Sequence, residues 1–266
     1  GGMPVASLWK DLEQDLPPQG KRSEDNVRDL GAHREKKAEA EGKKAPLPTP
    51  ADVEAWTEAL LASQKSLNIL REKRGYTLET IKKFRLGINR GRFTIPVYDE
   101  AGELVNVRRY LPDARQASDK MLNIQGHGKA RLFLVDALEH DEVLITEGET
   151  DAILARQYGF NAMSHTSGAS VWMDAWSHLF EGKHVFICYD VDDAGRNGAI
   201  KVGNSIGRFA AGVYLVKLPL RAKGADITDF FVSQGYGAED FQRLLDEARN
   251  HPHGRTAAKV RSSTKR

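Results

Sequence analysis

The chain of 266 residues has a single cysteine, Cys188, which excludes an internal disulfide and any cysteine-rich zinc module within this sequence. Cys188 lies in an apolar segment, so we expect an inert buried thiol rather than a nucleophile. The sequence also lacks an apolar run of membrane-spanning length and the hydrophobic core of a signal peptide. We therefore expect a cytoplasmic protein with no membrane partner.

The net charge is only +2, but the charge is unevenly distributed. Residues 65–131 contain 15 Lys and Arg against 7 Asp and Glu, whereas residues 132–250 contain 10 against 18. A basic region beside an acidic one fits the handling of a polyanion: the first would hold phosphates, and the second would bind the cations that activate them. Uneven solvated surface charge is the alternative explanation.

Composition divides the chain into four regions. Residues 1–50 are rich in mixed charge and proline, so we expect a disordered or linker segment. Residues 51–135 combine helical periodicity with a β-hairpin signal, which predicts a smaller basic α+β subdomain. Residues 136–250 alternate apolar runs with helical segments, which predicts an α/β domain with a parallel sheet flanked by helices. Residues 251–266 are polar and basic, and we expect a flexible tail.

Within the α/β domain, three short apolar runs with strand character lead into acidic residues. The runs are residues 143–146, 184–189 and 212–218; the acids are Glu147, then Asp190 with Asp192, then Asp226. The expected helices of this domain are residues 150–158, 170–179, 194–210, 227–233 and 238–249. Because ligands gather beyond the carboxyl ends of parallel strands, we expect these acids to share one crevice.

Like charges in one crevice repel each other unless cations lie between them, and carboxylate oxygens suit Mg²⁺ or Mn²⁺. We therefore predict a site for two or more divalent metal ions. Taken alone, Asp190 and Asp192 are also explained as a turn or a helix cap. We rank Asp151 below Glu147 as a ligand, because a position in the first turn of a helix is explained by local capping or pairing.

Several basic and small residues are candidates to contact phosphates. We expect Arg108, Arg109, Lys120 and Lys129 to form a phosphate-binding face turned toward the acids, although a solvated strand end explains any one of them. Gly195 and Arg196 open a helix whose N-terminus attracts phosphate, with a plain strand-to-helix turn as the alternative for the glycine. Lys223 is either a phosphate contact or a balance for nearby acids. His165 follows a strand end and is a further candidate to line the site.

Glu147-Gly148 with Asp151, and Asp190-Val191-Asp192 with Ala194-Gly195-Arg196, resemble two motifs of the Toprim domain. That domain is shared by DnaG-type primases, topoisomerases, OLD-family nucleases and RecR-type repair proteins. The resemblance implies a small Rossmann-like parallel sheet flanked by helices, with the glutamate and aspartates binding Mg²⁺.

Upstream residues narrow the resemblance to the catalytic core of DnaG-type primases. Residues 74–87, residues 95–99 with Gly102, the Arg108-Arg109 pair and residues 120–123 resemble that core in the same order, and Lys223 with Asp226 matches its last acidic motif. The resemblance covers about residues 65–250. It adds Asn123 to the nucleotide- or DNA-binding candidates.

This sequence departs from the family at two points. Bacterial primases of this family carry a cysteine-rich zinc domain, and the fused phage and plasmid versions carry a helicase with a Walker A motif; this sequence has neither pattern. We therefore expect a catalytic core alone, more like a phage or plasmid primase.

The resemblance implies a DNA-dependent RNA polymerase that makes short RNA primers on single-stranded DNA from ribonucleoside triphosphates, with a replicative helicase as partner. One alternative is a metal-dependent nuclease on the same scaffold, against which the arginine-rich residues 92–131 count. Another is a non-catalytic DNA-binding factor in the manner of RecR proteins. A topoisomerase needs a larger clamp than this chain provides.

Overall fold

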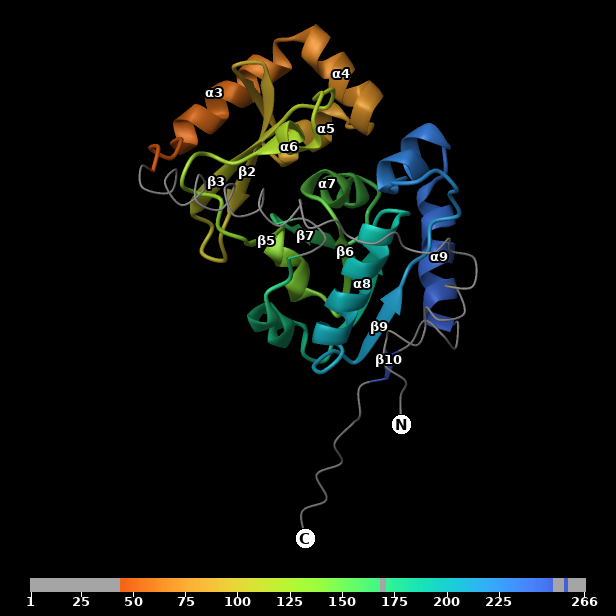
Figure 1. Ribbon diagram of the computed structural model, residues 1–266. Helices are drawn as coiled ribbons and strands as arrows, with labels where there is room; N and C mark the ends of the chain where they lie inside the picture. The colour runs from red at the N-terminus through yellow and green to blue at the C-terminus, as the bar shows by residue number, and fades with distance from the viewer. Residues whose placement is uncertain (1–43, 168–170, 251–255, 258–266) are drawn as a thin grey trace, which may run out of the picture. The chain divides into compact units, whose positions relative to one another are not determined.

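The computed structural model describes residues 44–167, 171–250 and 256–257 (Figure 1). Of the linker expected over residues 1–50, residues 1–43 therefore lie outside the described residues. Most of the expected flexible tail also lies outside them. Its two described residues, Thr256 and Ala257, pair with an edge strand instead of forming a free tail. An edge strand offers unpaired backbone groups, which explains this pairing.

Helices and strands follow one another along the chain in a mixed order. The elements are α3 (Pro50–Leu61), α4 (Gln64–Arg74), α5 (Leu78–Lys83), β1 (Gly87–Asn89), β2 (Arg92–Tyr98), β3 (Leu104–Tyr110), α6 (Ala117–Lys120), β4 (Met121–Leu122), β5 (Leu132–Phe133), η2 (Val135–Glu139), β6 (Glu142–Thr146), α7 (Glu149–Gln157), β7 (Ala162–His165), η3 (Asp174–Phe180), β8 (His184–Cys188), α8 (Asp193–Ile206), β9 (Gly212–Leu215), η4 (Asp229–Ser233), α9 (Ala238–Asn250) and β10 (Thr256–Ala257). None of the described helices combines the length and apolar character needed to cross a lipid bilayer.

The described chain forms two compact units. Residues 44–67 and 81–129 make one, which we call the antiparallel unit, and residues 68–80 and 130 onward make the other, which we call the parallel-sheet unit. The chain passes from the antiparallel unit to the parallel-sheet unit after residue 129, close to the boundary expected at residue 135. Residues 68–80, which the sequence placed in the basic subdomain, belong instead to the parallel-sheet unit.

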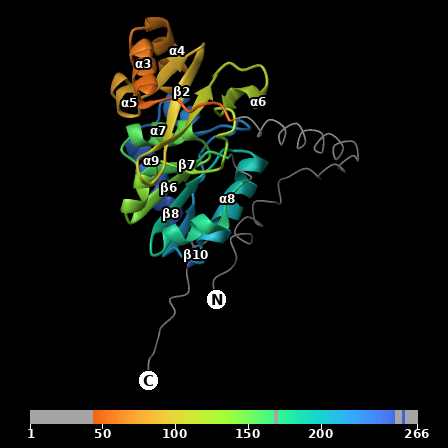
Figure 2. The same ribbon diagram turned by 90° about the vertical axis from the view of Figure 1, so that its left-hand side faces the viewer.

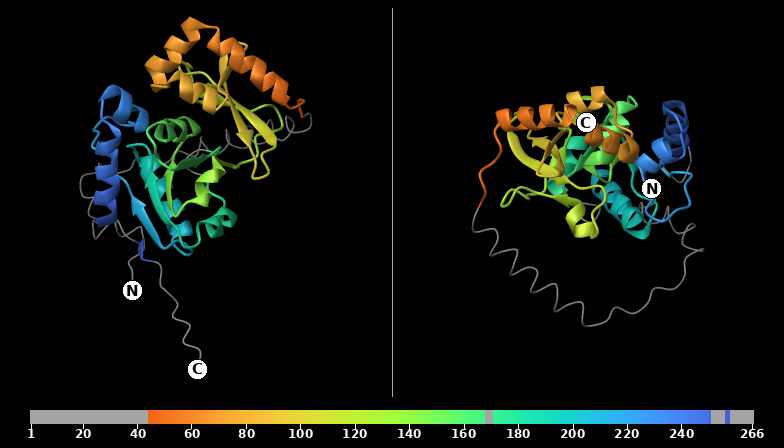
Figure 3. Two further views of the ribbon diagram at one scale, coloured as in Figure 1. Left: turned by 180° about the vertical axis from the view of Figure 1, so that it is seen from behind. Right: turned by 90° about the horizontal axis from the view of Figure 1, so that it is seen from above.

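The antiparallel unit is built on the predicted hairpin of β2 and β3. Its sheet has the order β1-β2-β3-β4, with antiparallel neighbours throughout. Helix α3 contacts β1, and Figure 3 shows it running along this sheet. Thr49 and Asp52 cap this helix, each side chain accepting a hydrogen bond from the other residue's backbone N–H.

The parallel-sheet unit confirms the predicted α/β architecture. Its six strands have the order β10-β9-β8-β6-β7-β5 (Figure 1). The four inner strands are mutually parallel, and the two edge strands pair with them antiparallel. The carboxyl ends of β6 and β8 are level, because Thr146 pairs with Cys188. The residues that follow these two strands therefore lie at the same edge of the sheet.

Side chains alternate between the two faces of this sheet, as the period of a strand requires. Val143, Ile145, Val185 and Ile187 pack into the core on the face that α8 covers. The opposite face carries Phe186 and Tyr214, whose stacked rings lie under the guanidinium of Arg249 from α9. Figure 2 shows α8 and α9 on opposite sides of the strands. Two covered faces explain why the strands read as continuous apolar runs.

Two predicted helices of this unit differ in type and extent from the structure. The segment expected as a helix over residues 170–179 forms the 3-10 helix η3, where the Trp172 indole N–H donates to Ser177 Oγ, and Ser205 Oγ donates to Asp174. The segment expected over residues 227–233 forms the short π-helical turn η4. Ser205 lies 31 residues after Asp174, so periodicity alone does not reveal the hydrogen bond between them.

Candidate active site

Glu147 and Asp190 meet at the carboxyl edge of the parallel sheet, as expected. Glu147 follows β6 directly, and Asp190 lies two residues beyond β8. The backbone N–H of Asp190 donates a hydrogen bond to Glu147 Oε2 at 3.3 Å. The level ends of β6 and β8 produce this contact, since each strand delivers its acid to the same point.

Asp226 reaches the same place through the loop that follows β9. Two backbone hydrogen bonds join this loop to the segment after β8, from Val191 N–H to the Ala225 carbonyl at 2.9 Å and from Gly224 N–H to the Val191 carbonyl at 3.1 Å. The predicted convergence of acids from three strand ends is therefore present. Their role as metal ligands stays a prediction.

Asp192 serves as the N-cap of α8, which was the alternative reading of this residue. Its Oδ1 accepts a hydrogen bond from Gly195 N–H at 2.8 Å. A Cβ atom on Gly195 would lie 2.3 Å from the Asp190 carbonyl oxygen, which backbone atoms cannot accommodate. The glycine is thus required for the strand-to-helix turn itself. One oxygen of Asp192 is committed to the cap.

Asp151 lies beside these acids, and its lower rank as a ligand stays a prediction. It lies in the first turn of α7 and is buried. Its Oδ1 accepts a hydrogen bond from Thr228 Oγ1 at 3.2 Å. Its carboxylate acts electrostatically on Asp190, which places it within the same group. We call Glu147, Asp190 and Asp192 the acidic trio, and Asp151 with Asp226 the acidic pair.

Burial and mutual repulsion raise the proton affinity of this site. Burial is the largest cause that raises the pKa of Asp190 to about 9, and the carboxylates of Asp151, Glu147, Asp226 and Asp192 add to it. Burial also raises the pKa of Glu147, and the carboxylates of Asp192 and Asp226 add to this, while the hydrogen bond from Asp190 N–H opposes it. These acids hold more negative charge than the site can stabilise alone.

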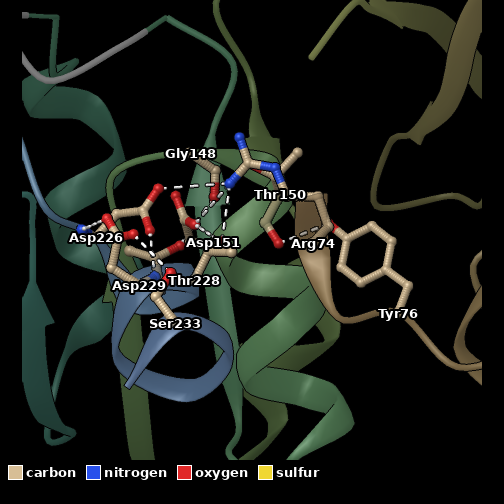
Figure 4. Close-up of polar contacts among 10 residues, drawn as sticks. Arg74, Tyr76, Gly148, Thr150, Asp151, Asp226, Thr228, Asp229 and Ser233 are labelled. Atoms are coloured by element: carbon tan, nitrogen blue, oxygen red, sulfur yellow. Dashed lines mark hydrogen bonds and ion pairs between the residues drawn. The ribbon is translucent and has the colours of Figure 1, made fainter. Parts of the chain in front are cut away.

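Arg74 is a residue of this site that sequence reasoning missed. Its side chain is 6% exposed, and Nη1 lies 3.4 Å from Asp226 Oδ2 and 3.6 Å from Asp151 Oδ1 (Figure 4). The same nitrogen donates to Thr228 Oγ1 at 2.9 Å. Arg74 lies 152 residues before Asp226 in the chain, so no local pattern connects them. Its place in the primase-like stretch of residues 74–87 was the only available signal.

The donor set fits Mg²⁺ or Mn²⁺, which prefer carboxylate oxygens. The site gathers five carboxylates, and the buried guanidinium of Arg74 lies near two of them, so divalent cations would offset the remaining repulsion. Among the residues that the structure describes, no three acidic, His or Cys side chains already surround a single point as ligands. The fit therefore rests on the charge and chemistry of the acids.

The predicted phosphate contacts of the basic region lie in the antiparallel unit. Arg108 on β3 is buried and donates to Asn123 Oδ1, which also accepts a hydrogen bond from Asn106 at 2.8 Å. Arg109 points to the other face of β3 and is half-buried, while Lys120 and Lys129 are exposed. The structure thus brings Arg108 and Asn123 together. The expectation that this basic face turns toward the acids stays a prediction.

Three further candidates lie in the parallel-sheet unit. Arg196 forms an ion pair with Asp193, one turn away on α8. Lys223 is exposed on the loop before Asp226. His165 at the end of β7 is buried, and its Nε2 lies 3.0 Å from the hydroxyl of Tyr189. Burial lowers the pKa of His165 to about 4, so the imidazole is neutral at physiological pH.

Comparison with known proteins gives similarity in both sequence and fold. The Toprim domain family matches residues 142–218. The chain is 26% identical to a DNA primase of Helicobacter pylori over 196 residues, which cover 55% of this chain and 34% of that primase. The chain thus spans about a third of the length of this curated relative.

Solved primase structures share the fold. A primase of Aquifex aeolicus, comprising zinc-binding and RNA polymerase domains, gives a TM-score of 0.61 at 20% identity and covers 74% of this chain and 59% of its own. A DNA primase domain from Pseudomonas aeruginosa gives a TM-score of 0.60 at 21% identity, and the match covers 74% of this chain and 77% of that domain's chain. The RNA polymerase domain of Mycobacterium tuberculosis primase DnaG gives a TM-score of 0.56 at 16% identity, and the match covers 82% of this chain and 84% of that domain's chain. The described core therefore has the fold of primase catalytic cores.

Proposed function

We propose that this chain, which carries a Toprim domain over residues 142–218 within the fold of a DnaG-type primase core, is a DNA primase. It would be a DNA-dependent RNA polymerase that makes short RNA primers on single-stranded DNA from ribonucleoside triphosphates. The observation that carries this proposal is the gathering of acids from successive strand ends around Asp190, whose pKa is raised to about 9. Such a site binds cations, and nucleotidyl transfer requires them.

The acidic trio holds Mg²⁺ or Mn²⁺ in this proposal, with Asp226 beside it. The chemistry that bound ions would supply is a lower barrier for attack by the primer 3′-hydroxyl and neutralisation of the departing pyrophosphate. Glu147 is oriented by the hydrogen bond that it accepts from Asp190 N–H. The cap bond from Gly195 holds Asp192 in one rotamer and leaves its second oxygen for an ion.

The antiparallel unit supplies the contacts to phosphate. Arg108 is held in place by Asn123, so its guanidinium is preorganised to bind a triphosphate or a template phosphate. Arg109, Lys120 and Lys129 add positive charge for the template, and Arg196 and Lys223 add it near the acids. Single-stranded DNA and ribonucleotides are the proposed ligands. A replicative helicase is the proposed partner, in the replication of a phage or plasmid.

A primer-synthesis assay tests this function. The full chain is incubated with mixed-sequence single-stranded DNA, labelled ribonucleotides and Mg²⁺ or Mn²⁺. We expect short labelled products that disappear in Asp190→Asn. Asp246→Asn is the matched control, because Asp246 is an exposed acid on α9 outside the site, and it should retain activity.

Other outcomes identify the alternative functions. Metal-dependent shortening of the DNA without new products would replace the primase proposal with a nuclease. DNA binding that survives Asp190→Asn, without turnover of any kind, would replace it with a non-catalytic binding factor.

A further inference from the structure

Residues 74–80 are fastened to α7 by a dense set of hydrogen bonds. The Gln157 side chain donates to the Gly75 carbonyl at 2.9 Å and accepts from Thr77 N–H at 2.9 Å and from Thr80 Oγ1 at 2.6 Å. The Tyr76 hydroxyl donates to the Thr150 carbonyl at 2.8 Å. We call residues 74–80 the strap. These hydrogen bonds hold the backbone that follows Arg74 against α7.

The strap passes close to the helix turn η4 at Gly75. Gly75 adopts a φ of +67°, and a Cβ atom at this position would lie 2.5 Å from Val232 Cγ2. A left-handed glycine at such close approach fixes the direction in which the chain leaves α4. The strap thus brings Arg74 to Asp151 and Asp226 (Figure 4).

Arg74 pairs with Asp226 and Asp151, which form the acidic pair. Asp226 uses Oδ2 for the guanidinium, and its Oδ1 accepts a hydrogen bond from Asp229 N–H at 2.9 Å. Asp151 lies 3.6 Å from the same guanidinium nitrogen and accepts from Thr228. The acidic pair therefore already lies beside one cation, the Arg74 guanidinium. It also accepts hydrogen bonds from the Thr228 hydroxyl and the Asp229 backbone N–H.

The acidic trio is in a different environment. Glu147 accepts one backbone hydrogen bond, and Asp192 accepts one from Gly195. Within the described ranges, no donor lies within hydrogen-bond distance of the Asp190 carboxylate, and all the charged neighbours that affect it are acids. Among the described residues, the site is thus divided into a half that pairs with a buried guanidinium and a half that does not.

We propose that Arg74 is a positioning residue whose guanidinium neutralises the acidic pair and thereby directs divalent cations to the acidic trio. Asp226 then orients the site through Arg74 and is a weak metal ligand. This inference rests on the proposed function for its biological meaning, because it refines how that site takes up metal. Its test uses Mn²⁺ binding alone, so it succeeds or fails independently of primer synthesis.

The decisive measurement is Mn²⁺ binding to the metal-stripped full chain, by calorimetry and by the loss of the free-ion electron paramagnetic resonance signal. Arg74→Gln removes the charge but keeps a side chain that can donate to Thr228. Because a fixed positive charge beside the ion repels it, we expect Arg74→Gln to bind Mn²⁺ about fivefold more tightly or to take up an additional ion.

Arg156→Gln is the matched control. Arg156 is also a largely buried arginine of the parallel-sheet unit, 3.0 Å from Asp136, but it contacts none of the five acids. Its loss should lower the thermal unfolding temperature and leave Mn²⁺ affinity unchanged. If Arg74→Gln behaves in the same way, Arg74 is merely structural and the proposal is overturned.

A second pair of variants keeps the inference testable if Arg74→Gln fails to fold. Asp226→Asn should weaken Mn²⁺ binding by less than about threefold, because Arg74 already occupies that carboxylate, whereas Asp190→Asn should weaken it by about tenfold or more. Equal losses in the two variants would make Asp226 a full metal ligand and refute the division of the site.

Discussion

At the scale of single residues, Asp190 links the stability of the protein to pH. Its pKa rises from 3.8 to about 9 on folding, so the folded state binds this proton more tightly than the unfolded state. The contribution of this group to stability is therefore complete below pH 3.8 and is lost as the pH rises toward 9. We expect the thermal unfolding temperature of the metal-free protein to fall over this window, and Mn²⁺ to restore it.

Thermal unfolding in a chelating buffer between pH 5 and pH 9 measures this effect, since the range lies within the shift of Asp190. Asp190→Asn should flatten the pH dependence, whereas Asp246→Asn on α9 should leave it unchanged. A variant curve parallel to that of the natural chain would show that another group is responsible.

Gly195 gives a second prediction at this scale. In Gly195→Ala, the new methyl group meets the Asp190 carbonyl oxygen 2.3 Å away, so the loop that carries the acids must move. We expect a loss of about 1–3 kcal/mol in the free energy of unfolding, together with weaker Mn²⁺ binding. Denaturant titration and calorimetry measure the two effects.

Gly237→Ala is the matched control for this substitution. A Cβ atom there would make an ordinary contact of 3.7 Å with Asp240, so stability and metal binding should both persist. Undiminished Mn²⁺ affinity in Gly195→Ala would mean that the loop relaxes without displacing its acids.

The sequence located Glu147, Asp190, Asp192 and Asp226 because each follows an apolar run, and strand ends are a local signal. It could not locate Arg74 or the contacts of Asp151. Both residues belong to the site through contacts with Thr228 and Asp226, and these contacts arise only when distant segments pack together. Long-range ion pairs leave no periodic trace in a sequence.

At the scale of elements, the bond network of Gln157 decides how firmly the strap is held. Gln157→Leu removes three hydrogen bonds between α7 and residues 75–80. At about 1 kcal/mol for each net hydrogen bond, we expect a loss of about 2–3 kcal/mol in stability. Primer synthesis should also fall, because Arg74 loses its fixed backbone.

Amide hydrogen exchange gives the direct measurement for the strap. The Thr77 N–H, which donates to Gln157 Oε1, should exchange faster in Gln157→Leu than in the natural chain. Amides of β8 should keep their exchange rates, since this strand lies in the core of the sheet. Unchanged exchange at Thr77 would show that other contacts suffice to hold the strap.

The sequence predicted long elements better than short ones. The runs that became β6, β8 and α9 were placed within a residue or so, because each offers a full period of apolar positions. Strands β1, β4 and β5 were missed, since two or three residues carry no periodicity. They form because neighbouring strands offer unpaired backbone groups, which is a property of the assembled sheet.

At the scale of the whole molecule, the separation of charge predicts salt-dependent binding of single-stranded DNA. Residues 65–131 carry 15 basic against 7 acidic residues. Each phosphate contact adds about 0.7 to the slope of log affinity against log salt concentration for single strands. We expect Lys120→Gln and Lys129→Gln each to weaken DNA binding and to reduce the slope by about this amount.

Fluorescence anisotropy over a series of salt concentrations measures this slope. Lys217→Gln is the matched control, because Lys217 is an exposed lysine that follows β9 in the acidic half of the sequence. If the control reduced the slope as much as the two variants did, binding would depend on the net charge of the chain alone.

The fold class followed from the alternation of strands and helices, which is a property of the entire sequence. The division into units followed only in part. Residues 68–80 belong to the parallel-sheet unit because Tyr76 and Arg74 find their partners on α7 and in the loop before η4. Composition places this stretch with its basic neighbours, since composition is blind to partners that lie elsewhere in the chain.

The separation of Arg74 from its partners has a consequence for biosynthesis. Arg74 and Thr228 are 154 residues apart, so a ribosome that adds about 5–20 residues per second needs roughly 8–30 seconds to pass from one to the other. Throughout that interval the nascent polypeptide contains the strap, but the loop before η4 that pairs with Arg74 has not yet been translated. A translation product that ends before residue 226 lacks Asp226 and the loop that receives Arg74, so we expect it to lack the folded acidic site.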